Sequence, residues 1–127
     1  LMKLNNKIGL IDSQDALIGN KVYDLASLID DVRYKTSKNF KNRMLNLYLK
    51  FQKKINRKKF KNDFEIISVL RNLKIIGIFT RLAVRDKKTR YLKLIPHAWS
   101  LIELRSKNNN KFKDLKNLLN DYGIKSL

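Results

Sequence analysis

Two aspartates near the start of the sequence have the chemistry and the spacing of ligands for a divalent metal. Asp12 ends a short apolar run, residues 8–11, and Asp24 lies in the helical pattern that follows. Mg²⁺ prefers oxygen ligands and is usually held by one or two carboxylates together with the phosphates of a substrate. A strand that brings Asp12 into a loop, backed by a helix that carries Asp24, therefore suits a metal beside phosphates. An aspartate at the end of a strand is also common in ordinary turns, so both interpretations stay open.

The elements around these aspartates are predicted from the spacing of apolar residues. Residues 7–11 are predicted to form a strand, and the polar residues before them a loop or the start of a hairpin. Asp15, in the polar turn after Asp12, fits either a metal-assisting role or a turn cap, and the turn is favoured. A helix is expected from Asn20 onward, with its apolar positions on one face. Asp24 lies beside that face, so we expect it to be partly buried and to need a polar partner.

Several segments of the sequence resemble a known enzyme family. Residues 11–19 (Ile-Asp-Ser-Gln-Asp-Ala-Leu-Ile-Gly) and residues 23–28 (Tyr-Asp-Leu-Ala-Ser-Leu) resemble the metal-binding segment of the aminoglycoside phosphotransferase family, which shares the protein-kinase-like fold. Within that family they are most similar to the anomeric sugar kinases that act on N-acetylmuramate and N-acetylglucosamine. Three shorter stretches resemble the C-terminal part of the same branch: residues 77–82, 85–86 and 90–92. The resemblance covers most of residues 8–105.

The resemblance implies a role for each carboxylate. Asp12 matches the aspartate that binds the Mg²⁺ bridging the phosphates of ATP in kinase-like enzymes. Asp24 matches a buried helix aspartate that braces the catalytic loop from behind, and Asp15 remains a structural residue of the turn. ATP and Mg²⁺ are then the cofactors, and a nucleotide and an amino sugar the ligands, although no substrate-binding residue is specified. Ser13 stands where the family usually has phenylalanine, which removes an apolar anchor beside Asp12.

The catalytic loop of such an enzyme is not found in the sequence. A kinase-like phosphotransferase needs an Asp that accepts the hydroxyl proton and an Asn that holds metal, in a His-x-Asp-x-x-x-x-Asn arrangement. No such motif occurs in the chain, which begins at Leu1 about where that loop would have ended. We therefore expect a C-terminal portion of a longer phosphotransferase, with its catalytic Asp upstream of Leu1 and the missing N-terminal part as its partner. Alone, the chain is expected to be inactive.

The predicted fold is mainly α, as in the C-terminal part of a protein-kinase-like C-lobe with a small β element at its N-terminal edge. Residues 1–127 are expected to form one partial domain, in which residues 1–19 hold the strand and metal-binding loop and residues 20–127 the helical subdomain. The apolar fraction of 43% suits a globular chain, and no apolar run reaches the ~18 residues that span a bilayer. The absence of Cys agrees with a cytoplasmic location. No membrane partner is expected.

Two long helices are predicted in the middle of the chain. The first begins at an N-cap at Thr36 or Ser37 and presents an apolar stripe to the core: Phe40, Met44, Leu47, Tyr48, Phe51 and Ile55. The second is capped at Asn62 and Asp63 and is expected to be the most buried helix, especially around residues 75–79. Gly77 in that helix is expected to allow close packing against another helix.

Two further helices are predicted after a turn at residues 85–88. Pro96 is expected in the first turn of one of them, where its missing N–H costs nothing. The last is short, begins around Phe112 and ends near Gly123. The one histidine, His97, excludes a metal site built from several histidines and is interpreted as a structural or exposed residue rather than a catalytic one.

The strong positive charge offers an alternative function. The chain carries 29 Lys and Arg against 11 Asp and Glu, a net charge of +18, and no acidic residue occurs between Val32 and Asn62. A small basic helical protein that binds nucleic acid through Arg33–Lys61 is therefore the alternative. The charge is spread along the whole chain and comes with no nucleic-acid motif, which favours a solvated surface instead.

Overall fold

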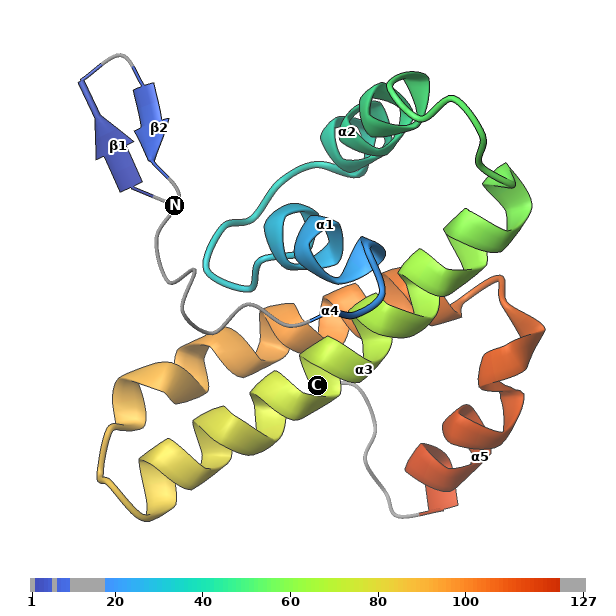
Figure 1. Ribbon diagram of the computed structural model, residues 1–127. Helices are drawn as coiled ribbons and strands as arrows, with labels where there is room; N and C mark the ends of the chain where they lie inside the picture. Colours follow the sequence, from blue (N-terminus) through green and yellow to red (C-terminus); the bar gives the residue numbers. More distant parts are fainter. Residues whose placement is uncertain (1, 6, 10–17, 122–127) are drawn as a thin grey trace.

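The computed structural model describes residues 2–5, 7–9 and 18–121. Strands β1 (Met2–Leu4) and β2 (Lys7–Gly9) pair antiparallel and form a hairpin at the edge of the molecule (Figure 1). The other elements are helices: α1 (Val22–Ile29), α2 (Lys38–Lys50), α3 (Arg57–Val84), η2 (Thr89–Leu94), α4 (Ile95–Ser106), η3 (Asn110–Phe112) and α5 (Lys113–Asp121). The prediction of a mainly α fold with a small β element at its N-terminal edge is confirmed.

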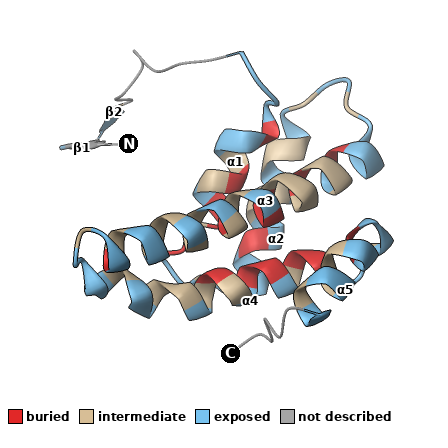
Figure 2. Cartoon of the chain, turned by 90° about the horizontal axis from the view of Figure 1, so that it is seen from below, coloured by how far each residue is buried: buried red, intermediate tan, exposed pale blue. Residues whose placement is uncertain are grey.

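Helix α3 is the central element of the fold. Helix α1 packs against its first half, and after a turn α4 returns alongside it (Figure 1). The buried residues of α3 and α4 lie largely on the sides where the helices meet (Figure 2). The core consists of three clusters, whose fully buried apolar members are Ala26, Ile29 and Phe64, then Val32, Ala98 and Leu101, then Val69, Ile102 and Phe112.

The long helix begins earlier than the sequence predicted. Its N-cap is Asn56, whose side chain accepts a hydrogen bond from the Lys59 N–H, whereas Asn62 and Asp63 lie inside the helix. Lysine and arginine are good helix formers, so the basic run after Asn56 continues the helix readily. Phe60 becomes buried through this extension and stacks on Tyr48 of α2, with ring centroids 5.5 Å apart.

Helix α2 differs from its prediction in length and in the side that it buries. The Ser37 cap is confirmed, since its hydroxyl accepts from the Phe40 N–H, but the helix ends at Lys50 and does not reach Ile55. Its one fully buried residue is Lys41. Three members of the predicted apolar stripe are exposed instead: Phe40, Leu47 and Phe51. Helix α2 lies beside α1 on the outside of the molecule and is not enclosed by its neighbours (Figure 1).

The most buried part of α3 is its first half rather than residues 75–79. Residues 75, 76, 78 and 79 are half-buried, and Gly77 is exposed. A side chain built at Gly77 would meet nothing within 4 Å. The expectation that Gly77 allows close packing against another helix is therefore wrong, because α4 covers a different side of α3.

The predictions for the turn after α3 and for Pro96 are confirmed. Helix α3 ends at Val84 before the turn, and Pro96 lies in the first turn of α4. Helix α5 is described over Lys113–Asp121, and its predicted end near Gly123 lies outside the described residues. The apolar stretch before Pro96 forms the 3₁₀ helix η2, in which Tyr91 packs on Phe79 with ring centroids 5.2 Å apart. None of the helices that the structure describes is both long and apolar enough to cross a membrane.

Replacing Gly77 by alanine is expected to stabilise the protein by about 0.5–1 kcal/mol, because glycine in a helix interior costs conformational entropy and the space around it is open. The measurement is the midpoint of urea unfolding. A lower midpoint for Gly77→Ala would mean that a neighbour outside the described residues contacts this position.

Candidate functional site

Of the three aspartates predicted from the sequence as metal-site or supporting residues, the structure describes Asp24 alone. Asp12, Asp15 and Ser13 lie outside the described residues. Asp24 lies in the first turn of α1 and is exposed, so the expectation that it is partly buried in this chain is wrong. The apolar face of α1 is narrower than predicted, because Leu28 is exposed and only Val22, Ala26 and Ile29 are fully buried, with Leu25 half-buried beside them. Asp24 lies outside this face.

No group of three or more potential metal ligands of the types His, Cys, Asp and Glu occurs among residues 2–5, 7–9 and 18–121. The prediction of Asp12 as a metal ligand therefore stays a prediction. Asp24, as a single exposed carboxylate, has the oxygen chemistry that Mg²⁺ prefers but not the number of ligands that a protein-built site needs.

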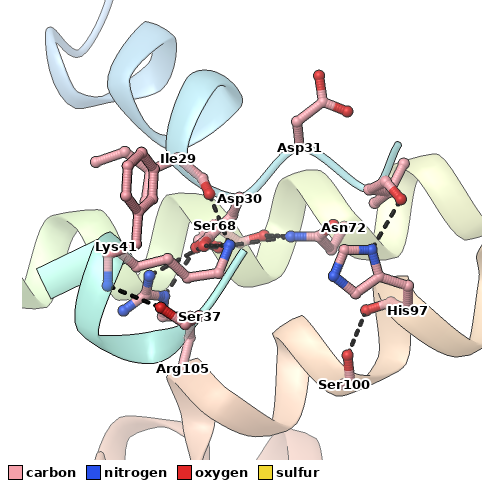
Figure 3. Close-up of polar contacts among 12 residues, drawn as sticks. Ile29, Asp30, Asp31, Ser37, Lys41, Ser68, Asn72, His97, Ser100 and Arg105 are labelled. Carbon is pink, nitrogen blue, oxygen red and sulfur yellow. Dashed lines mark hydrogen bonds and ion pairs between the residues drawn. The ribbon is translucent and has the colours of Figure 1, made fainter. Parts of the chain in front are cut away.

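The buried carboxylate of this region is Asp30, which directly follows α1. Its side chain is fully buried and is contacted from three other helices (Figure 3). The Arg105 guanidinium of α4 donates two hydrogen bonds, Nε to Oδ2 at 2.8 Å and Nη2 to Oδ1 at 3.0 Å. The Ser68 hydroxyl of α3 donates to Oδ2 at 2.7 Å, and Lys41 Nζ of α2 lies 3.1 Å from Oδ1. One carboxylate thus joins four helices.

The charges around Asp30 do not cancel. Two cations, Lys41 and Arg105, face one carboxylate, and all three are buried. Lys41 also donates to the carbonyl of Ile29 at 2.7 Å, at the C-terminal end of α1, where the helix dipole favours a cation. The Arg105 guanidinium lies 4.9 Å above the centre of the Phe64 ring, which adds a cation–π contact.

Burial alone would raise the pKa of Asp30, but the contacts with Arg105, Ser68 and Lys41 outweigh it and lower that pKa below its usual value of 3.8. These partners interact with the charged form of the carboxyl and therefore favour it. Asp30 is a charged structural group, and nothing in its contacts leaves it free to exchange a proton with a substrate.

The next residue, Asp31, organises the loop between α1 and α2. Its carboxylate accepts hydrogen bonds from the backbone N–H of Arg33 at 2.9 Å and from the Arg33 Nε at 3.0 Å. Partial burial opposes the ionised form, yet the Arg33 contacts lower the pKa of Asp31. His97 of α4 contacts the Val32 carbonyl through Nδ1 at 2.8 Å, which supports its predicted structural role (Figure 3).

Sequence reasoning missed the Asp30 cluster although two weak signals were present. Val22, Ala26 and Asp30 follow one another at spacings of four, so Asp30 continues the buried face of α1. Lys41, Leu45 and Tyr48 likewise share one face of α2. A charged residue on an apolar face is a sign of a buried ion pair, but its partners cannot be found without the fold.

The basic segment Arg33–Lys61 contributes surface on α2, on the α2–α3 loop and on the first turns of α3. Its lysines and arginines are exposed, except for Lys41 in the Asp30 cluster. The structure therefore gives these cations two different uses, one internal and the others facing solvent.

Comparison with known proteins bears on the function of the segment. No family model matches the chain. The chain is 32% identical over 98 residues to an N-acetylmuramate/N-acetylglucosamine kinase of Caulobacter vibrioides, a region that is 77% of this chain and 27% of that protein. It is 35% identical over 105 residues to a protein of the same name from Neisseria meningitidis, covering 76% of this chain and 30% of the relative.

A third relative of the same name, from Pseudomonas aeruginosa, is 31% identical over 117 residues, which cover 87% of this chain and 35% of that protein. The chain is similar to part of these sugar kinases. It spans about a third or less of the length of the curated relatives that it matches. The similarity to the third relative covers 87% of the chain and therefore includes the helices joined by Asp30.

Replacing Asp30 by alanine is expected to destabilise the protein by about 3–5 kcal/mol, because Lys41 and Arg105 would stay buried without a counter-charge. The matched control is Asp31→Ala. Its partner Arg33 is 68% exposed, so solvent screens the pair and about 1 kcal/mol or less is expected. Chemical unfolding of the two variants measures the difference, and equal losses would contradict the assigned role of Asp30.

The Asp30 cluster also predicts acid sensitivity. The folded pKa of Asp30 lies below its usual value of 3.8, so the unfolded chain binds a proton first as the pH falls. The stabilisation is complete above that value and is lost as the pH falls below it. Carbon-detected NMR of the Asp30 carboxyl should give a midpoint below 3.8. A midpoint at or above this value would contradict the charged cluster.

Proposed function

We propose that the chain is the C-terminal part of an ATP- and Mg²⁺-dependent phosphotransferase that acts on a hydroxyl group of an amino sugar. The observation that carries this proposal is the 31–35% identity to sugar kinases over most of the chain. The mainly helical fold is compatible with the C-terminal part of a kinase-like C-lobe. Phosphoryl transfer in such enzymes depends chiefly on positioning and on neutralisation of the phosphate charge.

In this proposal Asp12 holds the Mg²⁺ that bridges the nucleotide phosphates, as the resemblance of residues 11–19 implies. A carboxylate oxygen suits that ion. Asp15 caps the polar turn that follows Asp12. Asp24 supports the catalytic loop from the outer side of α1, and its exposure in this chain leaves it accessible to a loop contributed by the proposed longer protein.

The Asp30 cluster supplies the rigid frame for this site. The proposed metal loop leads through Gly19 and Asn20 into α1, where the Asn20 side chain accepts a hydrogen bond from the Val22 N–H at 3.1 Å. Asp30 fixes the other end of α1 to α2, α3 and α4. The helix that follows the proposed metal loop is therefore held in place, and small displacements of a catalytic group are costly to the rate.

We further propose that the chain alone is inactive and that a longer protein contributes the catalytic aspartate and the lobe that covers the nucleotide. We also propose that this protein acts in the cytoplasm. Relatives of about three times its length support this view. An in-frame coding sequence upstream of Leu1 that contains His-x-Asp-x-x-x-x-Asn would identify the missing part. A stop codon followed by a start at Met2 would instead contradict it.

The test is phosphate transfer from ATP to N-acetylmuramate or N-acetylglucosamine by a longer protein that carries this segment. Asp12→Ala should abolish turnover and leave the unfolding midpoint unchanged, because the proposed role of Asp12 is to hold the metal. Asp15→Ala should retain activity within about tenfold if it only caps a turn. Turnover by Asp12→Ala within about tenfold of the unaltered protein would refute the assignment of Asp12.

A further inference from the structure

Three apolar side chains on one side of α2 and its C-cap are uncovered. Phe40 is 48% exposed, Leu47 45% and Phe51 77%. They follow one another at spacings of seven and four residues, which places side chains on one face of a helix. The sequence pattern assigned all of them to the core, and the structure leaves them outside it. These residues are called the α2 apolar stripe below.

Cations border the α2 apolar stripe. Arg43 and Lys50 line the same shallow hollow as Phe40 and Leu47, together with three asparagines of α2. Further exposed cations continue through the loop into the first turns of α3: Lys53, Lys54, Arg57, Lys58, Lys59 and Lys61. No acidic residue occurs in residues 33–61, so this segment contains nothing that neutralises them. The surface combines uncovered apolar groups with a strong positive charge.

The contacts of α2 explain why the stripe stays uncovered. Its inner side is held by Lys41 on Asp30 and by the stacking of Tyr48 on Phe60. Met44 and Leu45 are half-buried and pack against the core. The inner side is therefore satisfied by polar and aromatic contacts, and the stripe is left on the flank that faces solvent.

We propose that this surface docks on an anionic lipid bilayer, with α2 lying in the plane of the membrane interface. Amphipathic helices that expose Phe and Leu beside Lys and Arg bind in this way, with the apolar side chains entering the headgroup boundary by about 5–10 Å. Charge complementarity identifies the lipid class, since each Lys or Arg near an anionic surface raises partitioning by about fivefold. The proposal is independent of the phosphotransferase assignment and goes beyond it.

The spacing of the aromatic residues favours lipid over single-stranded nucleic acid. Phe40 and Phe51 lie eleven residues apart, with the aliphatic Leu47 between them. At a rise of 1.5 Å per residue this is roughly 16 Å along the helix. Single strands are bound by aromatic faces that stack successive bases, which residues so far apart do not provide. A bilayer accepts any continuous apolar strip.

The proposal revises the sequence-based expectation of no membrane partner. That expectation rested on the lack of a spanning run, and the described helices do lack one. A helix that lies on a membrane needs neither that length nor an apolar character all round. It needs an uncovered apolar strip, which became visible only when the structure showed Phe40, Leu47 and Phe51 outside the core.

The experiment is co-sedimentation of the chain with vesicles of phosphatidylcholine alone or with about one-third phosphatidylglycerol, at about 0.15 M salt. The unaltered chain should bind the anionic vesicles and not the neutral ones. Phe40→Ser with Leu47→Ser should weaken binding about tenfold or more, since burial of each side chain is lost. Arg43→Gln with Lys50→Gln should weaken it about twentyfold. Far-ultraviolet circular dichroism confirms that each variant is folded.

Matched controls come from exposed residues elsewhere. Leu118 of α5 is 53% exposed, and Lys87 and Lys88 are exposed in the turn after α3. Leu118→Ser and the pair Lys87→Gln with Lys88→Gln should bind as the unaltered chain does. Equal losses in the controls would mean general electrostatic attraction and would overturn the proposal.

Other occupants of the stripe give distinct results, each of which overturns the proposal. A second copy would appear as a dimer in size-exclusion chromatography that Phe40→Ser with Leu47→Ser returns to monomer. If the stripe binds nucleic acid, the chain should bind a single-stranded oligonucleotide and should not bind the vesicles. An internal contact would appear if a longer protein carrying this segment fails to bind vesicles that the chain itself binds.

Discussion

The described part of the fold depends on one buried carboxylate. Asp30 takes no part in the apolar core, yet the end of α1, the start of α2, the middle of α3 and the end of α4 all meet at its two oxygens. A charged carboxyl out of water is costly unless every lone pair has a partner. Here Arg105, Ser68 and Lys41 supply those partners from three different helices. The buried charge is therefore fully compensated only when all four helices are in place.

This constraint explains the placement of α2. A helix with an apolar stripe normally buries it, but α2 buries Lys41 and leaves much of the stripe outside. The ion pair with Asp30 and the contact with the Ile29 carbonyl fix the orientation of α2 about its own axis. Buried ion pairs are weak sources of net stability because desolvation offsets the attraction, whereas they select one geometry strongly. In this protein the selected geometry turns Phe40 and Leu47 toward solvent.

The sequence predicted what depends on local chemistry. The Ser37 cap, the turn after Val84 and the start of α4 at Pro96 follow from the conformational preferences of a few residues, and all are confirmed. The candidate metal residue Asp12 came from its position after an apolar run and from a resemblance, and it lies outside the described residues, so it stays a prediction.

What the sequence could not predict depends on distant partners. Asp30 meets Ser68 38 positions later and Arg105 75 positions later, and no local pattern links residues so far apart. The prediction from helix spacing placed Phe40 and Phe51 in the core, because such a prediction assumes that the apolar residues of a helix face the core. The assumption is wrong for α2, because Lys41 faces the core and pairs with the buried carboxylate of Asp30.

The contacts of Asp30 connect the two helices, α1 and α2, that are adjacent to the proposed functional regions. Helix α1 follows the proposed metal loop, and α2 carries the proposed membrane surface. The two helices are joined through Asp30 and through the short loop in which Asp31 binds Arg33. The Lys41 ammonium contacts both the Asp30 carboxylate and the Ile29 carbonyl, so directional charge-assisted contacts set the position of α2 against the end of α1. A membrane contact through α2 would therefore also fix the orientation of α1 relative to that membrane.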